Sequence, residues 1–301
     1  MSDNDTDRPL EMPDRSRIEA DVRALAVPRH PSNSAAALRA AEDHVAQELG
    51  AAGLRVERQL FTYRGAEYHN VLGTLEGSDP ELPWVVVGAH FDSVARSPGA
   101  DDNASGVAAM LEAARLLSRH DLAATVQFVG FNLEEMQSIL GPFRIGSRAY
   151  ARRLRERGQA LAGALVLEML GFTGPRQVVP AAVRLVKRIP RTGNFLAAVG
   201  GGDAGSSALL CAFARAAEGI VPVVTLAVPL RGWAVPDTRR SDNARFWDEG
   251  YPALMITDTA ELRNPHYHRS SDTPETLDWD FLLKSTAAVA AAVRRLASSG
   301  D

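Results

Sequence analysis

The sequence predicts an α/β fold with a mixed, mostly parallel central sheet and helices on both faces. Two observations lead to this prediction. Short apolar runs, such as Val85-Val86-Val87 within residues 84–91, are typical of strands that are buried on both faces. These runs alternate with helix-forming segments, such as the alanine-rich residues 103–120. Strands that alternate with helices favour a parallel sheet that helices cover on both sides.

The individual elements follow from local periodicity. Helical spacing of apolar residues is present in residues 16–25 and 35–53, whereas residues 54–63 and 68–75 alternate like the strands of a hairpin. Further strands are expected at 84–91, 125–132, 164–169, 221–228 and 253–257, and further helices at 103–120, 143–157, 204–219, 242–249 and 276–297. The glycine-rich residues 193–205 and the charged residues 230–240 are expected to be loops.

The length and composition of the chain indicate a single domain. The chain has 301 residues, of which 46% are hydrophobic, enough for a sizeable core. We expect a single domain over residues 16–301, preceded by a polar, acidic and disordered leader over residues 1–15. The leader lacks the basic end and apolar stretch of a signal peptide, so a cytoplasmic location is expected. A secreted chain that had already lost its signal would look the same.

Charge and cysteine content exclude several classes of protein. Lys and Arg number 33 and Asp and Glu number 37, so the formal net charge of −4 does not favour nucleic acid as a partner. No apolar run reaches the roughly 18 residues of a membrane span, so no membrane partner is expected. The single cysteine, Cys211, excludes an intramolecular disulfide and a multi-cysteine metal site. The sequence does not indicate an oligomeric state.

Three expected strands end in residues of types that commonly bind metals. His90 ends the first, Glu134 and Glu135 follow the second, and Glu168 lies near the end of the third. Because sites in such sheets form beyond the carboxyl ends of the strands, these side chains are expected at one edge.

His90 and the acidic pair after it have a structural interpretation and a functional one. Asp92 is a candidate acceptor for the second ring nitrogen of His90, which would fix the direction of the ring. Alternatively, His90 is a core histidine. Asp101 and Asp102 precede a helix, where acidic residues often serve as N-caps. After His90, a carboxylate that bridges two metals is the alternative for Asp102, with Asp101 as a cap or a supporting residue.

The glutamates also allow two interpretations. Glu134 and Glu135 could lie in a solvated loop, but adjacent acids at a buried strand end are costly without a function. In the functional interpretation, Glu135 binds a metal and Glu134 is the base that accepts a proton from water. Glu168, in an otherwise apolar strand, needs a partner, which is either a metal or an arginine.

The last candidates lie near the C-terminus, in Asn264-Pro265-His266-Tyr267-His268. His266 and His268 compete for the role of a ligand, and Tyr267 could donate its hydroxyl to a developing oxyanion or simply pack. The set mixes nitrogen and oxygen ligands and contains no thiolate. Such a set suits zinc, with cobalt or manganese as possible substitutes, and is large enough for two ions.

Taken in order, these motifs resemble the co-catalytic zinc exopeptidases of clan MH, which include bacterial zinc aminopeptidases, aminopeptidase Y, glutamate carboxypeptidase and glutaminyl cyclase. The resemblance runs from His90 to about Leu277. It rests on Gly-Ala-His-Phe-Asp-Ser, Gly-Ala-Asp-Asp-Asn-Ala-Ser-Gly, the Glu-Glu pair, Ser-Asp-Asn with Phe-Trp at 241–247, and Tyr-His before Asp-Thr. The ordered set is highly specific, although no single piece is decisive.

The resemblance implies two zinc ions and a role for each residue. One zinc would be held by His90, Asp102 and Glu168, and the other by Asp102, Glu135 and His268. It further implies Glu134 as the general base, Asp92 as the residue that orients His90, and Tyr267 as an oxyanion donor. The bond from Asp102 to Asn103 matches one that is often cis in the family.

The sequence departs from the family pattern at three positions. Aspartate is usual where Glu168 stands, which puts occupancy of the His90-side metal in doubt. Gly146-Ser147 comes ten residues after the Glu-Glu pair instead of within a few, so the loop that borders the site is expected to be enlarged. Asn243 replaces a histidine that is common after Ser-Asp.

The expected activity is that of a zinc aminopeptidase, in which metal-activated water cleaves N-terminal residues from peptide substrates with Glu134 as base. A glutaminyl-cyclase-like acyltransferase with one zinc is an alternative, as is a dipeptidase or carboxypeptidase of the same family. A third possibility is a binding domain that keeps the fold without catalysis, which the filled ligand and base positions disfavour.

Overall fold

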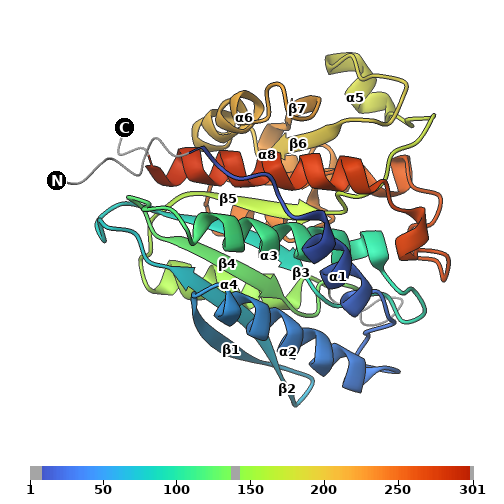
Figure 1. The fold of residues 1–301 in the computed structure, drawn as a ribbon. Helices are drawn as coiled ribbons and strands as arrows, with labels where there is room; N and C mark the ends of the chain where they lie inside the picture. The colour runs from blue at the N-terminus through green and yellow to red at the C-terminus, as the bar shows by residue number, and fades with distance from the viewer. Residues whose placement is uncertain (1–8, 137–142, 299–301) are drawn as a thin grey trace.

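A single mixed sheet forms the centre of the fold (Figure 1). The computed structural model describes residues 9–136 and 143–298. In this part of the chain the sheet has eight strands in the order β1-β2-β4-β3-β5-β8-β6-β7. The strands are β1 (Arg55–Tyr63), β2 (Ala66–Leu75), β3 (Trp84–His90), β4 (Val126–Phe131), β5 (Leu161–Glu168), β6 (Leu196–Gly200), β7 (Val223–Ala227) and β8 (Ala253–Thr257).

Four neighbouring strands in the middle of the sheet, β4, β3, β5 and β8, are parallel. The hairpin β1–β2 joins β4 in antiparallel orientation, and β6 is antiparallel to β8. The helices are α1 (Arg15–Leu25), α2 (Ala35–Ala51), α3 (Gly106–Leu117), α4 (Ile145–Glu156), α5 (Ala181–Val186), α6 (Ala204–Ala216), α7 (Asn243–Asp248) and α8 (Trp279–Ser298). This arrangement confirms the predicted fold class, a mixed and mostly parallel sheet.

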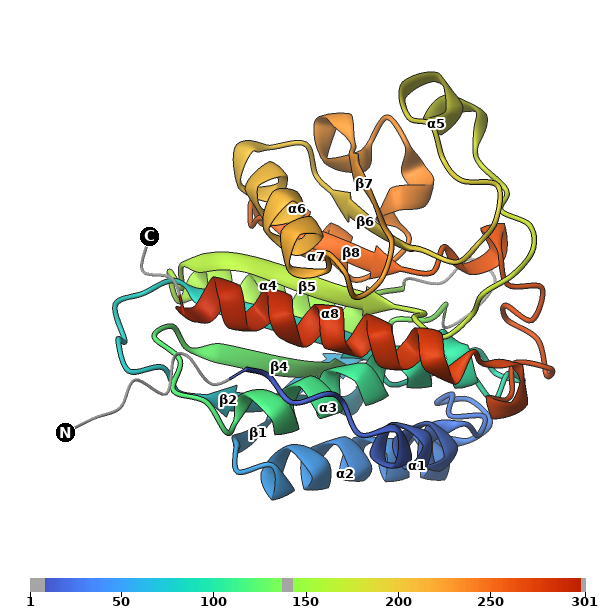
Figure 2. The same cartoon turned by 45° about the horizontal axis from the view of Figure 1, so that its top comes forward.

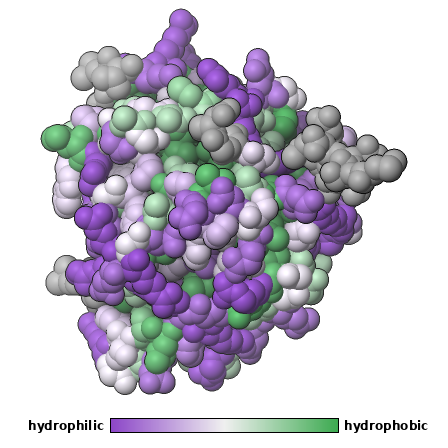
Figure 3. All heavy atoms as spheres, turned by 90° about the vertical axis from the view of Figure 1, so that its left-hand side faces the viewer, coloured by the Kyte–Doolittle hydropathy of each residue, from purple (hydrophilic) through white to green (hydrophobic). Residues whose placement is uncertain are grey.

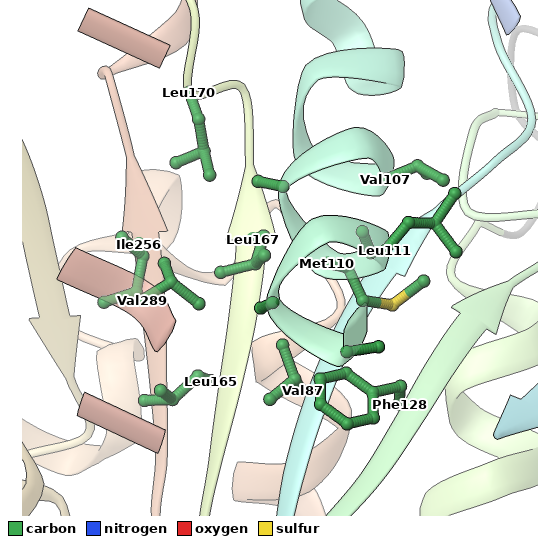
Figure 4. Packing of buried hydrophobic residues seen from close by; sticks show 14 of the residues in the cluster. Val87, Val107, Met110, Leu111, Phe128, Leu165, Leu167, Leu170, Ile256 and Val289 are labelled. Carbon is green, nitrogen blue, oxygen red and sulfur yellow. The ribbon is translucent and has the colours of Figure 1, made fainter. Parts of the chain in front are cut away.

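Helices cover both faces of the sheet, with α3 and α8 on one side and α4 and α7 on the other (Figure 2). Side chains alternate along each strand, so successive residues enter opposite layers. Val87, Phe128 and Leu165 pack against α3 and α8 (Figure 4), whereas Val86 and Val166 pack in the layer of α4 and α7. Burial of the central strands on both faces explains their continuous apolar sequences.

Two predicted boundaries were wrong. Residues 193–205 were expected to be a loop, but they contain β6, which pairs with both β7 and β8. Its small residues and glycines hide the alternation typical of a strand. Hydrogen bonds to β7 and β8 hold the segment in the extended conformation. The helix expected from residue 103 begins only at Gly106, because Asp102 (φ −102°, ψ 88°) and Asn103 (φ −133°, ψ 38°) are not helical. The short helix α5 was not predicted either.

The predicted leader, residues 1–15, lies partly outside the described residues, which begin at position 9. Asp14 caps α1 by accepting hydrogen bonds from the backbone amides of Ser16 and Arg17. The described residues contain no helix that is both long and apolar enough to cross a membrane. On the face in Figure 3, hydrophilic side chains surround smaller hydrophobic groups.

Candidate metal centre and active site

Five of the predicted side chains come together at one edge of the sheet. They form two groups that share Asp102, namely His90, Asp102 and Glu168, and Asp102, Glu135 and His268. Within each group one nitrogen or oxygen atom per residue lies within 4.8 Å of the others. The structure therefore assembles all five residues that the sequence analysis singled out as metal ligands.

The topology explains the convergence. His90 is the last residue of β3 and Glu168 the last residue of β5, and the two strands are parallel neighbours. Glu135 follows β4, on the other side of β3. Asp102 lies in the distorted turn Ala100–Ser105 that leads into α3, and its peptide bond to Asn103 is cis, as the family resemblance implied. His268 follows β8 and has a φ of 58°.

Distances within the two groups leave room for cations. His90 Nε2 lies 3.4 Å from Asp102 Oδ1 and 3.5 Å from Glu168 Oε2. His268 Nε2 lies 3.1 Å from Asp102 Oδ2 and 3.4 Å from Glu135 Oε2. All four distances exceed the roughly 2.7–2.9 Å of a charge-assisted hydrogen bond. A set of facing imidazoles and carboxylates suits zinc, so these residues fit the ions that the sequence analysis predicted.

The pKa shifts of the ligand side chains also indicate that this cluster favours positive charge. Burial opposes a charge on the His268 imidazole, but Asp102 and Glu135 outweigh it and raise its pKa to about 11. Burial and the Asp102 carboxylate raise the pKa of Glu135 to about 7. For Asp102 itself, burial is outweighed by His268 and His90, and its pKa is lowered. Because metal ligands bind in their deprotonated forms, metal binding to this cluster would release protons.

Two aspartates hold the chain segments that carry the ligands. The Asp92 carboxylate accepts hydrogen bonds from the backbone amides of Glu134 (3.0 Å) and Glu135 (3.1 Å). Asp272 does the same for Asp101 (2.9 Å) and Asp102 (3.1 Å). Each buried aspartate thus fixes two consecutive residues of the site, a role that the sequence analysis did not predict.

The predicted contact between Asp92 and His90 is present, but it is shared. His90 Nδ1 lies 3.2 Å from the backbone carbonyl of Asp92 and 3.5 Å from its carboxylate oxygen Oδ1. Both acceptors favour the tautomer with hydrogen on Nδ1, which leaves Nε2 to face the cluster. Asp92 therefore orients His90 with its main chain as well as its side chain.

Asp101 is a supporting residue. Its carboxylate accepts hydrogen bonds from the Gly171 amide (2.9 Å), the Asn264 side chain (2.7 Å) and Ser105 (3.1 Å). These bonds connect the turn that carries Asp102 to the loop that follows β5. The structure does not place Asp101 as a helix cap, one of the two roles that the sequence left open.

Glu134 is buried beside the cluster. Among the described residues, none forms a hydrogen bond to its Oε1 atom. Burial raises the pKa of Glu134 well above its usual value, although His90 opposes the shift. Its main chain is fixed on both sides, since its amide binds Asp92 and its carbonyl accepts from the Arg144 amide at 2.7 Å. Glu134 therefore has a fixed main chain and a buried carboxylate whose Oε1 atom is open to a hydrogen-bond donor.

Glu168 is held by a serine that the sequence analysis did not connect with it. Ser241 Oγ donates a hydrogen bond of 2.6 Å to Glu168 Oε2, the same oxygen that faces His90. The side chain of Glu168 is 14% exposed, and no arginine pairs with it among the described ion pairs. The arginine alternative for Glu168 is thus not supported in this part of the chain.

The two histidines of the Pro265–His268 segment have different surroundings. His268 faces the cluster, whereas His266 Nδ1 lies 2.9 Å from Ser271 Oγ and its ring contacts Phe172. Tyr267 stacks on the His268 ring with a centroid distance of 3.8 Å. Its hydroxyl accepts a hydrogen bond of 3.0 Å from Arg240. The enlarged loop predicted after Glu135 lies largely in residues 137–142, outside the described residues.

An apolar cavity of about 140 Å³ opens beside the cluster. Glu168, Ser241 and Tyr267 belong to its wall on the side of the cluster. Most of its other lining residues are apolar and come from β6, β7, β8 and the loops around them; they include Phe195, Ala197, Val199, Val224, Leu226, Met255 and Leu262. The strand β6, which the sequence analysis missed, therefore builds part of this cavity.

The fold and the site define a zinc-exopeptidase-like protein, and comparison with known sequences gives its family. The model of peptidase family M28 matches residues 70–293. The chain therefore belongs to peptidase family M28, which confirms the resemblance drawn from the motifs. It is a peptide hydrolase of the zinc metallopeptidase class, as the sequence analysis predicted.

Relatives agree with this assignment, and a solved structure shares the fold. The chain is 30% identical over 275 residues to the uncharacterized protein YfbL of Escherichia coli (strain K12), covering 87% of this chain and 82% of that protein. It is 29% identical over 247 residues to leucine aminopeptidase 1 of Trichophyton rubrum, covering 76% of this chain but 58% of that enzyme. The aminopeptidase of Aneurinibacillus sp. strain AM-1 shares the fold, with a TM-score of 0.73 at 18% identity over 96% of this chain and 95% of that one.

Proposed function

We propose that the protein is a zinc aminopeptidase that removes bulky apolar residues from the N-termini of peptides. The observation that carries this proposal is the apolar cavity beside an acidic cluster. The cavity wall contains three carboxylates, Glu168, Asp237 and Glu261, but one guanidinium, Arg240, which is paired with Glu261. Glu168 is a proposed zinc ligand and Glu261 is paired with Arg240, so Asp237 is the wall carboxylate that would attract the ammonium group of a peptide N-terminus and repel a C-terminal carboxylate.

We assign two zinc ions to the cluster, one held by His90, Asp102 and Glu168 and the other by Asp102, Glu135 and His268. When bound, the ions would supply Lewis-acid activation of the attacking water and of the scissile carbonyl. Cobalt and manganese are compatible with the same nitrogen and oxygen ligands.

The protein's own residues carry the proton transfer. Glu134 would accept the proton of the attacking water through its open Oε1 atom and later deliver it to the leaving amine. The Tyr267 hydroxyl would donate a hydrogen bond to the carbonyl oxygen as negative charge develops there. Asp92 and Asp272 keep the surrounding main chain in place through their backbone hydrogen bonds.

The cavity supports a preference for large apolar side chains. An apolar protein cavity of about 150 Å³ holds a benzene molecule, so the volume here is sufficient for leucine, methionine or phenylalanine. A glycine or alanine side chain would leave most of the cavity unfilled and forgo apolar contact. We therefore expect kcat/KM to rise with the apolar size of the N-terminal residue.

The alternative of a glutaminyl cyclase predicts one zinc and an N-terminal glutamine substrate. The convergence of all five ligand side chains supports two zinc ions instead. The dipeptidase and carboxypeptidase alternatives differ in the peptide end that they recognise, and the Asp237 carboxylate in the cavity wall supports the N-terminal end.

Peptide end-group chemistry tests the proposal. Zinc-loaded protein is incubated with a leucine-initiated hexapeptide in three forms, namely free, N-acetylated and C-amidated, and products are followed by mass spectrometry. We expect loss of N-terminal residues from the free and C-amidated forms and none from the N-acetylated form. Release of C-terminal residues, or resistance of the C-amidated form alone, would contradict the proposal. A glutamine-initiated peptide tests for loss of ammonia, which would favour the cyclase.

A further inference from the structure

Arg240 lies in the wall of the apolar cavity and reaches the hydroxyl of Tyr267. It directly follows the 3₁₀ turn Pro236–Arg239 and precedes Ser241. One terminal nitrogen, Nη2, donates a hydrogen bond of 3.0 Å to the Tyr267 oxygen, and the other, Nη1, pairs with the Glu261 carboxylate. The guanidinium carbon is 5.8 Å from the centroid of the Tyr267 ring. Two segments, the turn that ends at Arg240 and the loop that carries Glu261 and Tyr267, thus supply one arginine, one glutamate and one tyrosine.

This contact restricts the phenol proton. Because the Tyr267 oxygen accepts a hydrogen bond from Arg240, its own proton must point in another direction. The stacked His268 ring fixes the plane of the tyrosine at a centroid distance of 3.8 Å. The positive charge on Arg240 also polarises the phenol and strengthens it as a donor.

We propose that Arg240, held by Glu261, is a positioning residue that fixes the Tyr267 hydroxyl as a hydrogen-bond donor to the substrate carbonyl. The inference rests on the proposed aminopeptidase function, because it concerns how one of its residues is oriented. Glu261 keeps the guanidinium at the cavity wall, and the guanidinium acts through Tyr267 and not on the substrate directly.

A purely structural role does not account for the pair. The side chains of Arg240 and Glu261 are 44% and 37% exposed. Ion pairs with this exposure add little to the stability of a fold, since water solvates both charges when they are apart. Replacement of Arg240 should therefore leave a folded protein in which an effect on turnover can be measured.

The test compares Arg240→Met, Tyr267→Phe and the double variant, using leucine p-nitroanilide with zinc-loaded protein. Methionine keeps an apolar stem along the cavity wall and removes the donor. Loss of one charge-assisted hydrogen bond should lower kcat about 10- to 100-fold. KM should change little, because the interaction strengthens in the transition state. In the Tyr267→Phe background, Arg240→Met should have almost no further effect on kcat.

Two further variants sharpen the result. Arg240→Lys keeps one donor and should restore part of the lost kcat. Arg157→Met, which changes an exposed arginine at the end of α4, serves as the matched control and should match the wild type. Melting temperature and zinc content are measured for every variant, and we expect both to stay at the wild-type values.

The outcomes separate this inference from the proposed function. A wild type that releases no leucine would overturn the proposed function and, with it, the role of Arg240. An active wild type with unchanged kcat in Arg240→Met would overturn only the role of Arg240. The same holds if Arg240→Met raises KM alone, or if it lowers kcat equally with and without the Tyr267 hydroxyl.

Discussion

Single carboxylates at this site differ in role because they differ in what they contact. Asp92 and Asp272 accept hydrogen bonds from backbone amides and so hold the main chain beside the ligands in place. Asp102 faces both histidines, which places it between the two ligand groups. Glu134 is buried with one oxygen open. Residue type alone does not distinguish these roles, and the contacts of each side chain do.

Glu134→Gln tests the assignment of the base. Glutamine keeps the shape of the side chain but has no basic oxygen, and it removes none of the five proposed ligands. We expect kcat to fall by about 10²–10⁴-fold. Zinc content should match the wild type, and both quantities are measured on the same preparation.

Glu156→Gln, an exposed change at the end of α4, is the matched control for Glu134→Gln and should leave kcat unaltered. Near-normal kcat in Glu134→Gln would remove Glu134 from the role of the base. Loss of zinc in the same variant would instead make it a ligand.

Glu168 stands where the resemblance to the family leads us to expect an aspartate. Glu168→Ala should lose the His90-side zinc first and keep the other, so about one equivalent should remain after dialysis. Glu168→Asp should retain activity because it restores the usual ligand, although the shorter side chain reaches less far from β5. Two full equivalents of zinc in Glu168→Ala would show that Glu168 is not a ligand.

At the residue scale, the sequence predicted the side chains that end strands but not those that support them. His90 and Glu168 could be found because an apolar strand that ends in a polar residue is conspicuous. The hydrogen bond from Ser241 to Glu168 and that from Arg240 to Tyr267 could not, because each joins segments that approach only in the folded chain. Asp272 stood beside a recognised motif, but nothing local showed that it would bind the amides of Asp101 and Asp102.

Among the elements, the central parallel strands and β7 were predictable, whereas β6 was not. The run Val85–Val87 identifies β3 because burial on both faces selects apolar residues throughout. Strand β6 has the sequence Leu-Ala-Ala-Val-Gly and is followed by two more glycines, a composition typical of loops. Its order comes from hydrogen bonds to β7 and β8, which depend on tertiary pairing.

The segment between α1 and α2 supports the metal site from outside the region that matches the family model. Arg29 is fully buried and donates hydrogen bonds to the backbone carbonyls of Phe91, Pro98 and Gly99 at 2.6, 2.5 and 3.0 Å. It also binds the carbonyl of Leu25, at the end of α1. This single side chain therefore connects the N-terminal helices to the loop between His90 and Asp102.

Arg29→Met should destabilise the fold, because several buried carbonyls would lose their donor. Each hydrogen bond to a charged group contributes about 1.5–3 kcal/mol, so we expect a loss of at least about 3 kcal/mol in the free energy of unfolding. Urea denaturation of zinc-free protein measures this without a contribution from bound metal. Arg39→Met, an exposed change on α2, is the control. Equal stability of the two variants would show that Arg29 does not hold this loop.

On the scale of the whole molecule, the sheet determines where chemistry takes place. The carboxyl ends of β3, β4 and β5 bring His90, Glu134, Glu135 and Glu168 to one edge, and the loop after β8 adds His268. The antiparallel strand β6 extends the sheet beyond β8 and lines the cavity beside the cluster. The ligands and the substrate cavity thus come from neighbouring parts of one sheet. The ordered motifs predicted the ligands, but most of the cavity lining is apolar and lies outside those motifs, so the sequence did not predict the cavity.

A zinc titration with product analysis tests the central claim most directly. Zinc-free protein is titrated with zinc, and the release of leucine from a leucine-initiated peptide is measured at each step. We predict that leucine release rises until about two equivalents are bound and then levels off, as expected of two ions acting together. Full activity at one equivalent, or saturation with zinc without any release of leucine, would contradict it.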